Sequence, residues 1–425
     1  MSEQALIGSF SKVRRGASPR PIGAPKYFGG EVGWIRISDV TNSSKYLRKT
    51  EQYVSPLGES LSVRVNPGDL IMSICGTIGK PIIIDIPACI HDGFVQLYDI
   101  QNADIEYLYY LLQFHERDLG ARGQPGTQVN LNTGIVEAFQ VFFPSLPDQR
   151  KIAIILSTVD AVIEKTEQAI EKYRAIKQGM MHDLFTRGLD EKGKLRPRYE
   201  DAPHLYEKTE LGWLPKEWKE VRIEQFASEE KNAIVDGPFG SNLKTIHYRA
   251  EGIPIIQSGF VTSNEFKADN YLYVTPEKFL SEIRSKVSPG DIVMAKIGAQ
   301  CGTCAILPED HPVGILAGNS LKITVAKNNS SMFLEAYLHY LYETGQIFLI
   351  ISTTAQPAVN MSALKIYPMI RPEIDEQKMI SERIAGLKSM IKTEEKNLNK
   401  YRNLKLGLMQ DFLTGRKRVK IEEAA

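Results

Sequence analysis

One long phrase occurs twice in the sequence. Residues 172–186 read KYRAIKQGMMHDLFT and residues 400–414 read KYRNLKLGLMQDFLT, an offset of 228 positions. The same ungapped offset places Pro144 on Pro372 and Gln149 on Gln377. A register of this length indicates an internal duplication, so we expect the two halves of the chain to fold alike.

Each copy of the phrase ends a segment with helical periodicity. Apolar residues recur in steps of four and three, which predicts a coiled-coil seam. Prolines and acids near each start, and Gly188 and Gly415 near each end, are typical helix boundaries. The seam positions are Ile152, Leu156, Val159, Ile163, Thr166, Ile170, Tyr173, Lys177, Met180 and Leu184, then Ile380, Ile384, Leu387, Ile391, Glu394, Leu398, Tyr401, Lys405, Leu408 and Phe412.

Polar residues interrupt both seams at equivalent places, Thr166 with Glu394 and Lys177 with Lys405. Interior polar residues of this kind fix the register of paired helices at some cost in stability. If the two helices pair antiparallel, Glu394 could lie within reach of a cation from its partner. Parallel pairing, and pairing with another chain, would also bury the stripe.

The segments before the helices correspond as well. VNPGDLIMS at 65–73 matches VSPGDIVMA at 287–295, a turn followed by a buried strand. We therefore predict a mixed α/β globule followed by a long helix, twice over. The predicted segments are a first globule at 1–146, a first long helix at 147–188, a charged linker at 189–207, a second globule at 208–371, a second long helix at 372–415 and a basic and acidic tail at 416–425.

Composition sets outer limits on the class of protein. The hydrophobic fraction of 43% suffices for ordinary cores. No apolar run approaches the ~20 residues of a membrane helix, and residues 1–16 do not resemble a secretory signal, so we expect a cytoplasmic protein. Cys301 and Cys304 form a C-x-x-C without a second pair, which favours buried thiols over a zinc site.

A search for catalytic motifs finds none that holds. Residues 76–81, GTIGKP, lack the first glycine of a phosphate loop and end in proline. The tetrapeptide of adenine methyltransferases is absent, and the seven histidines include no H-x-x-x-H pair. These observations favour a non-catalytic binding or scaffold protein, with no metal or cofactor of its own.

The order of these features resembles that of a known family. Globule and long helix alternate, the helices close on KYR phrases, and the second globule opens with TELGWLPKEW at 209–218 and DGPFGSNLK at 236–244. This pattern resembles the DNA-specificity subunit of type I restriction–modification systems, over nearly the whole chain.

The resemblance implies a fold and a set of partners. Each globule would be a target recognition domain that reads one half of a split DNA sequence, and the two helices would pair antiparallel. Partners would be double-stranded DNA, two adenine N6-methyltransferase (modification) subunits and restriction subunits with ATP-dependent translocase activity. S-adenosylmethionine, ATP and magnesium would belong to those partners, and no membrane is involved. The first globule lacks its own TELG phrase, so its start could be a short variant, or the tail GRKRVKIEEAA could supply the missing edge.

The helices have a suitable length for such a target. About 35 helical residues at ~1.5 Å each span roughly 50 Å. DNA rises ~3.4 Å per base pair, so this length covers about 15 base pairs. We expect helix length to set the gap between two half-sites.

Candidate DNA-binding residues are polar side chains in the two globules. Residues 1–50 hold nine Lys and Arg against three acids, a cluster that can meet phosphates. Base contacts favour Arg, Gln or Asn, and phosphate contacts favour Lys, Arg, Ser or Thr. The candidates are Arg14, Arg15, Arg20, Arg36, Lys45 and Arg48 in the first globule and Ser241, Asn242, Lys244, Gln257, Ser258 and Lys267 in the second.

Three alternatives stay open. The specificity subunit of a type IIB enzyme, whose partner combines nuclease and methylase, uses the same chemistry. A coiled-coil scaffold with protein-binding globules would show no salt-dependent DNA binding. An enzyme with an unrecognised site would show activity as an isolated chain.

Overall fold

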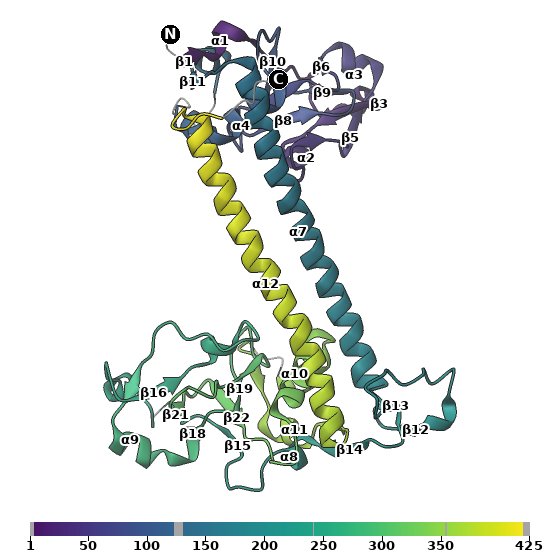
Figure 1. Ribbon diagram of the computed structural model, residues 1–425, viewed down its shortest axis with the longest axis vertical. Coiled ribbons are helices and arrows are strands. Elements are labelled where there is room, and N and C mark those ends of the chain that lie inside the picture. The colour runs from purple at the N-terminus through teal and green to yellow at the C-terminus, as the bar shows by residue number, and fades with distance from the viewer. Residues whose placement is uncertain (1–3, 123–130, 241, 353–354, 420–425) are drawn as a thin grey trace, which may run out of the picture. The chain divides into compact units, whose positions relative to one another are not determined.

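The computed structural model describes residues 4–122, 131–240, 242–352 and 355–419. The chain forms two compact units, each assembled from separated stretches of sequence. Unit 1 combines residues 1–169 with 394–425, and unit 2 comprises residues 170–393. Each unit therefore contains one globule and part of both long helices, α7 (Leu146–Thr186) and α12 (Ile374–Leu413) (Figure 1).

Unit 1 contains two main sheets and a short strand pair. One sheet has the order β2-β10-β7-β8-β4, the other β5-β3-β9-β6, and β1 pairs with β11. The strands are β1 (Gln4–Leu6), β2 (Lys12–Arg15), β3 (Phe28–Ile35), β4 (Tyr46–Leu47), β5 (Gln52–Val54), β6 (Val63–Val65), β7 (Leu70–Ser73), β8 (Pro81–Ile84), β9 (Ala88–Ile90), β10 (Phe94–Tyr98) and β11 (Gln140–Phe142).

Unit 2 repeats this strand order, except that its described strands include no counterpart of β4. Its sheets run β15-β22-β19-β20 and β17-β16-β21-β18, and β14 pairs with β25 as β1 pairs with β11. Two hairpins, β12-β13 and β23-β24, are additional. The strands are β12 (Tyr206–Thr209), β13 (Gly212–Pro215), β14 (Lys219–Arg222), β15 (Ile234–Asp236), β16 (Ile253–Ile256), β17 (Tyr273–Val274), β18 (Lys286–Val287), β19 (Ile292–Ala295), β20 (Cys304–Ile306), β21 (Gly314–Leu316), β22 (Ser320–Ile323), β23 (Ile351–Ser352), β24 (Ala358–Val359) and β25 (Pro368–Arg371).

Shorter helices complete both units. Asp104 caps α4 by accepting from the Tyr107 amide, and Ser330 caps α10 in the same way through Phe333. The helices of unit 1 are α1 (Ile7–Phe10), α2 (Ile37–Thr41), α3 (Pro56–Ser60), α4 (Ile105–Phe114), α5 (Glu116–Ala121) and α6 (Thr133–Glu137); those of unit 2 are α8 (Ile223–Phe226), α9 (Pro276–Ser281), α10 (Ser331–Glu343) and α11 (Met361–Ile366).

Strands β7 and β19 lie at the centre of each unit, as the duplicated Pro-Gly-Asp phrase predicts. In β19, Ile292 and Met294 face one hydrophobic core while Val293 and Ala295 face another. Successive strand residues point to opposite faces, so a strand buried on both faces reads as an unbroken apolar run. Each unit therefore has three layers, with the central sheet between a second sheet and a layer of helices.

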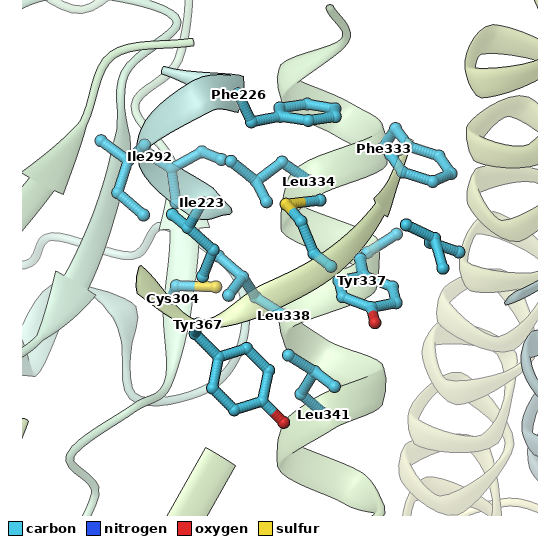
Figure 2. Close-up of a cluster of buried hydrophobic side chains, with 14 of the residues drawn as sticks. Ile223, Phe226, Ile292, Cys304, Phe333, Leu334, Tyr337, Leu338, Leu341 and Tyr367 are labelled. Carbon is cyan, nitrogen blue, oxygen red and sulfur yellow. The ribbon is translucent and has the colours of Figure 1, made fainter. Parts of the chain in front are cut away.

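The larger core of unit 2 joins α8 and α10 to the central sheet. Figure 2 shows Phe226 of α8, Phe333, Leu334 and Tyr337 of α10, and Cys304 of β20 among its side chains. Cys301 and Cys304 are buried and unpaired. The expectation of buried thiols is confirmed.

Within unit 1, the amino half of α7 pairs antiparallel with the carboxyl half of α12. Ile152 and Leu156 share a core with Met409 and Leu413 at one end of the contact. Farther along α7, Asp160 pairs with Lys405 at 2.7 Å and Glu167 with Arg402 at 2.7 Å. Successive contacts along the two helices join increasing residue numbers in α7 to decreasing residue numbers in α12. This confirms the antiparallel prediction within unit 1.

The interhelical ion pairs of unit 1 differ from the one expected at Glu394. The carboxylate of Glu394 accepts a long bond of 3.5 Å from Asn397 of its own helix. The cations come instead from α12, at Arg402 and Lys405, and the acids from α7. The polar seam position Lys405 also bonds to Gln113 at 3.1 Å, so it ties the helix pair to the globule.

Within unit 2, the other halves of the two helices pack together. Met181, Leu184 and Phe185 of α7 share a core with Ile380 and Ile384 of α12. Both long helices end before a glycine in left-handed conformation, Gly188 at φ 65° and Gly415 at φ 74°, as C-terminal caps commonly do. The predicted stops are confirmed.

The phrase TELGWLPKEW forms hairpin β12-β13 and leads to Trp218, which is 3% exposed. Unit 1 has no counterpart to this hairpin among its described residues. Val419 of the C-terminal tail packs against the main hydrophobic core of unit 1, and Gly415 lies against the Phe142 ring. Residues 415–419 form no strand, and residues 420–425 lie outside the described chain.

No helix in the described ranges is both long enough and apolar enough to cross a bilayer.

Candidate nucleic-acid interface

A glycine at the end of an edge strand begins a matching loop in each unit. The Gly16 amide donates to the Phe94 carbonyl at 2.9 Å, and the Gly237 amide donates to the Ser320 carbonyl at 2.9 Å. A Cβ at Gly16 would lie 2.1 Å from the His91 oxygen, and one at Gly237 would lie 1.9 Å from the Ala317 oxygen. Both loops thus rest against a second loop so closely that only glycine fits.

Strand pairing extends this correspondence residue by residue. Arg15 pairs with Val95 in unit 1, and Asp236 pairs with Leu321 at the matching place in unit 2. Arg15 and Asp236 each precede the close-packed glycine, so the two units carry opposite charges at one structural position.

A second matching pair of residues, Arg36 and Gln257, follows a strand of the second sheet in each unit. Arg36 follows Ile35, which pairs with Ile90, and Gln257 follows Ile256, which pairs with Leu316. Each is the amino-terminal cap of a short helical turn. Both were predicted DNA-binding residues, and both side-chain types can read base edges.

Three predicted arginines of unit 1 gather around His91 and Asp92. Arg15 donates from Nε to the Asp92 carbonyl at 2.7 Å, and Arg20 pairs with the Asp92 carboxylate at 3.0 Å. A hydrogen bond from Ser18 lowers the pKa of Asp92, against an opposing effect of burial and with help from Arg20. The carboxylate therefore stays charged and holds Arg20, while the backbone carbonyl of the same residue holds Arg15.

Arg36 is the third arginine of this group and lies near His91. Its Nε donates to Gln52 at 3.0 Å. Burial lowers the pKa of His91, and the positive charge of Arg36 lowers it further, although Asp92 opposes this. His91 is therefore neutral at pH 7, and the positive charge here belongs to Arg15, Arg20 and Arg36.

The other three predicted cations of unit 1 lie apart from this group. Arg14 bonds to Gln96 at 2.7 Å and lies over the Tyr98 ring. Lys45 pairs with Glu106 at 2.8 Å and Arg48 with Asp85 at 3.2 Å. Lys45 and Arg48 line a groove of about 640 Å³ between the globule and the helix pair of unit 1, so the structure divides the basic cluster of residues 1–50.

Unit 2 has a buried ion pair beneath its glycine loop. Lys296 donates from Nζ to Asp236 at 2.5 Å, and Arg284 donates to the other carboxylate oxygen at 3.0 Å. Burial raises the pKa of Asp236, but the hydrogen bond from Lys296 and the charges of Lys296 and Arg284 outweigh it, so the net shift is downward. The ammonium of Lys296 also lies 4.8 Å from the centre of the Phe239 ring.

The predicted residues of unit 2 fall into different environments. Lys244 is exposed, and no acidic side chain in the described ranges pairs with it. Ser258 is buried, with its amide 3.4 Å from the Asn319 side chain, and Asn242 is exposed in the glycine loop. Lys267 pairs with Glu265, which also binds Lys392 of α12, so it lies toward the helix. Ser241 lies outside the described residues.

Sequence reasoning missed Asp92 and Ser18 in unit 1 and Lys296, Arg284 and Phe239 in unit 2. One of these had a visible signal. The offset of 222 between the Pro-Gly-Asp phrases places Lys296 on Ile74, a cation where the first copy has an apolar residue. The positions of the other four residues depend on how the loops pack, which the sequence pattern does not indicate.

The arrangement offers guanidinium, ammonium and amide donors on loops, which suits DNA phosphates and base edges. Within the described part of the chain, no three His, Cys, Asp or Glu side chains lie close enough together to hold a metal ion.

Comparison with known proteins identifies the family. The sequence profile of the "Type I restriction modification DNA specificity domain" matches residues 3–172 and 215–401. The chain is 24% identical to the type I restriction enzyme MjaVIII specificity subunit of Methanocaldococcus jannaschii, over 98% of this chain and 93% of that protein. It is also 24% identical to the EcoBI specificity subunit of Escherichia coli, over 87% of this chain and 75% of that protein.

Solved structures share the fold. The S subunit of a type I restriction–modification system from M. genitalium matches with a TM-score of 0.57 at 15% identity, over 96% of this chain and 95% of that chain. A chain from a structural study of complex assembly in the type I system matches with a TM-score of 0.59 at 14% identity, over 97% and 98%. With two matched domains that cover most of its length, this chain belongs to the family of type I restriction–modification specificity subunits, whose role is not catalytic.

Proposed function

We propose that this chain binds a split DNA target within a type I restriction–modification complex, with one half-site read by each globule. Residues 1–146 and 208–371 are the two target recognition domains. Residues 147–188 and 372–415 are the helical spacers, joined through the linker at 189–207 and followed by the tail at 416–425.

One observation carries this proposal. The two units build the same loop framework, in which Gly16 and Gly237 make equivalent hydrogen bonds. The side chains on that framework differ, with Arg15 against Asp236 and Arg36 against Gln257. A shared frame with different hydrogen-bonding groups suits two domains that read different bases in the same way.

Partners supply the catalytic steps. Two modification subunits transfer methyl groups from S-adenosylmethionine, and restriction subunits use ATP and Mg²⁺ for translocation and cleavage. The complex acts in the cytoplasm, where it meets double-stranded DNA. Support comes from the relatives, which are named as specificity subunits of restriction enzymes, and from the structural relative described in terms of complex assembly.

Adenine-methylation mapping tests the proposal. DNA would be taken from cells that express this chain with its methyltransferase partner, and compared with DNA from cells that express the partner alone. A split methylated motif that appears only with this chain is the expected result. If the two proteins associate and no new motif appears, the chain does not direct methylation and a scaffold role gains support.

A further inference from the structure

Phe239 is an aromatic side chain displayed at the surface of unit 2. Its exposed fraction is 62%, although aromatic side chains usually contribute to cores or interfaces. It lies in the loop between β15 and the buried residue Leu243, and the exposed residue Lys244 directly follows Leu243. A large exposed ring in this loop is a candidate for contact with a binding partner.

The loop that carries Phe239 is braced on both sides. The Gly237 amide bonds to Ser320 at 2.9 Å, and the Asn242 amide bonds to the Phe239 carbonyl at 2.7 Å. A Cβ at Gly318 would lie 2.7 Å from the Pro238 oxygen, so the backbone of the loop contacts its neighbour directly. Leu243 anchors the far end in a small core with Ile255 and Val274.

A buried cation positions the ring. Lys296 is 8% exposed, bonds to Asp236 at 2.5 Å and places its ammonium 4.8 Å from the ring centre. A cation at this distance attracts the face of an aromatic ring. The ring is thus held by an ion pair below it and stays open to solvent above, as expected of a preorganised contact residue.

Unit 1 has no aromatic side chain at this place. Counting from the equivalent glycines, Gly16 and Gly237, the residue two positions on is Ser18 in unit 1 and Phe239 in unit 2. Ser18 bonds to the Asp92 carboxylate at 2.6 Å, and the same carboxylate pairs with Arg20. At this matched position of the described chain, the aromatic ring is therefore a feature of unit 2 and not of unit 1.

Resting on the proposed function, we infer that Phe239 is a stacking wedge that enters the DNA of the second half-site and opens one base step. Apolar side chains between base pairs are a recurring device of DNA-binding proteins, and they work beside cations that hold the phosphates. Lys244 supplies such a cation two residues beyond Asn242. The first half-site, read by a unit with Ser18, stays stacked at the corresponding step.

The test is a fluorescence scan of the assembled complex on its own target. Once mapping has given the motif, 2-aminopurine replaces one base at a time through both half-sites, and its emission rises where stacking is lost. Methyltransferases also extrude the adenine that they modify, so the methylated position in each half-site is left out of the comparison. The expected result is an emission increase at one additional step, in one half-site only.

Variants assign that signal. Phe239→Ala should abolish the additional increase and weaken DNA binding by roughly tenfold or more, since base–aromatic stacking is worth that much per base. Phe239→Tyr should restore both. Leu280→Ala removes an apolar side chain of similar exposure, 65%, from α9 and should change neither.

The outcomes separate the two levels of the argument. If the wild-type complex binds its target but shows no additional increase, or if Phe239→Ala leaves the increase and the affinity intact, the wedge is wrong while the proposed function stands. If methylation mapping yields no motif that depends on this chain, the proposed function fails and the wedge fails with it.

Discussion

Gln149 and Gln377 make the same hydrogen bonds in the two units. Gln149 accepts from the Asp104 amide at 2.9 Å and donates to the Pro144 carbonyl at 2.9 Å. Gln377 accepts from the Ser330 amide at 2.9 Å and donates to the Pro372 carbonyl at 2.8 Å. Each glutamine thus joins the start of a long helix to the amino-terminal cap of the globule's main helix.

Alanine at either glutamine should destabilise its own unit. Both side chains are buried, so each substitution leaves a backbone amide and a carbonyl without a partner, at about 1–3 kcal/mol for each group. Chemical denaturation of Gln149→Ala and Gln377→Ala, followed by hydrogen exchange, checks this. Loss of protection should concentrate at residues 104–114 in the first variant and 331–343 in the second; identical patterns would contradict the assignment.

Glu376 should be the most sensitive acid of unit 2. Its carboxylate accepts from Arg196 at 2.5 Å, from Trp218 Nε1 at 3.0 Å and from the Leu189 amide at 2.8 Å. Removing the buried carboxylate leaves Arg196 with the exposed Glu217 as its charge partner. Loss of a buried pair of this kind should lower the free energy of unfolding of Glu376→Gln by about 3–5 kcal/mol.

A matched control comes from the same arginine. Glu217 also pairs with Arg196 but its side chain is 73% exposed, so Glu217→Gln should cost under about 1 kcal/mol. Urea titrations of the two variants compare them directly. Equal losses would show that burial of Glu376 is not the cause.

The stability of unit 2 should fall in mild acid because of His339. Its Nε2 donates to the Cys304 carbonyl at 2.8 Å, and Nδ1 lies 3.2 Å from the Lys388 ammonium. Burial, helped by the Lys388 charge, lowers the pKa of His339 to about 3.

The sign follows from proton binding. Below about pH 6.5 the unfolded chain protonates this histidine and the folded chain does not, so stability is lost as pH falls from 6.5 toward 3. Between pH 7 and pH 5 the loss is about 2 kcal/mol. Burial raises the pKa of nearby Glu335, which opposes this trend, so the wild type is compared with His339→Gln over the same range. Parallel curves would rule the histidine out.

Lys244 should contact phosphate and not bases. Lys244→Ala in the assembled complex should weaken binding to every sequence alike and reduce the slope of log K against log salt by about one. Lys267→Ala is the control, since that ammonium already pairs with Glu265. A changed methylation motif in Lys244→Ala would place the side chain on a base instead.

Arg36 and Gln257 should each specify one base. Arg36→Ala should relax one position in the first half-site and Gln257→Ala one position in the second, each by about 1–3 kcal/mol of discrimination. Methylation mapping of both variants gives the answer in a single readout. If both variants relaxed sequence specificity in the same half-site, Arg36 and Gln257 would not hold equivalent places in the two units.

Sequence periodicity was sufficient for the repeat, the helix ends and the central strands. A duplicated register constrains both copies at once, and the seam of α7 and α12 needs only local spacing. The grouping of the candidate site residues depends on tertiary contacts, because Arg15 and Arg20 meet at Asp92 far along the chain and Arg36 lies near His91. Lys45 and Arg48 separate from them because β4 joins the edge of the central sheet beside β8. Sheet pairing of that range is set by tertiary packing, which no local pattern reveals.

The discontinuous make-up of unit 1 has a consequence for biosynthesis. Residues 170–393 contain every segment that unit 2 needs, whereas unit 1 waits for the stretch that begins at Glu394. On the ribosome, the unit translated second can therefore close first. Met409 and Leu413 belong to the first core, so the earliest-made globule keeps part of its apolar surface uncovered until they emerge. A nascent chain that has emerged only as far as residue 393 would hold a complete unit 2 and a unit 1 whose core still lacks Met409 and Leu413.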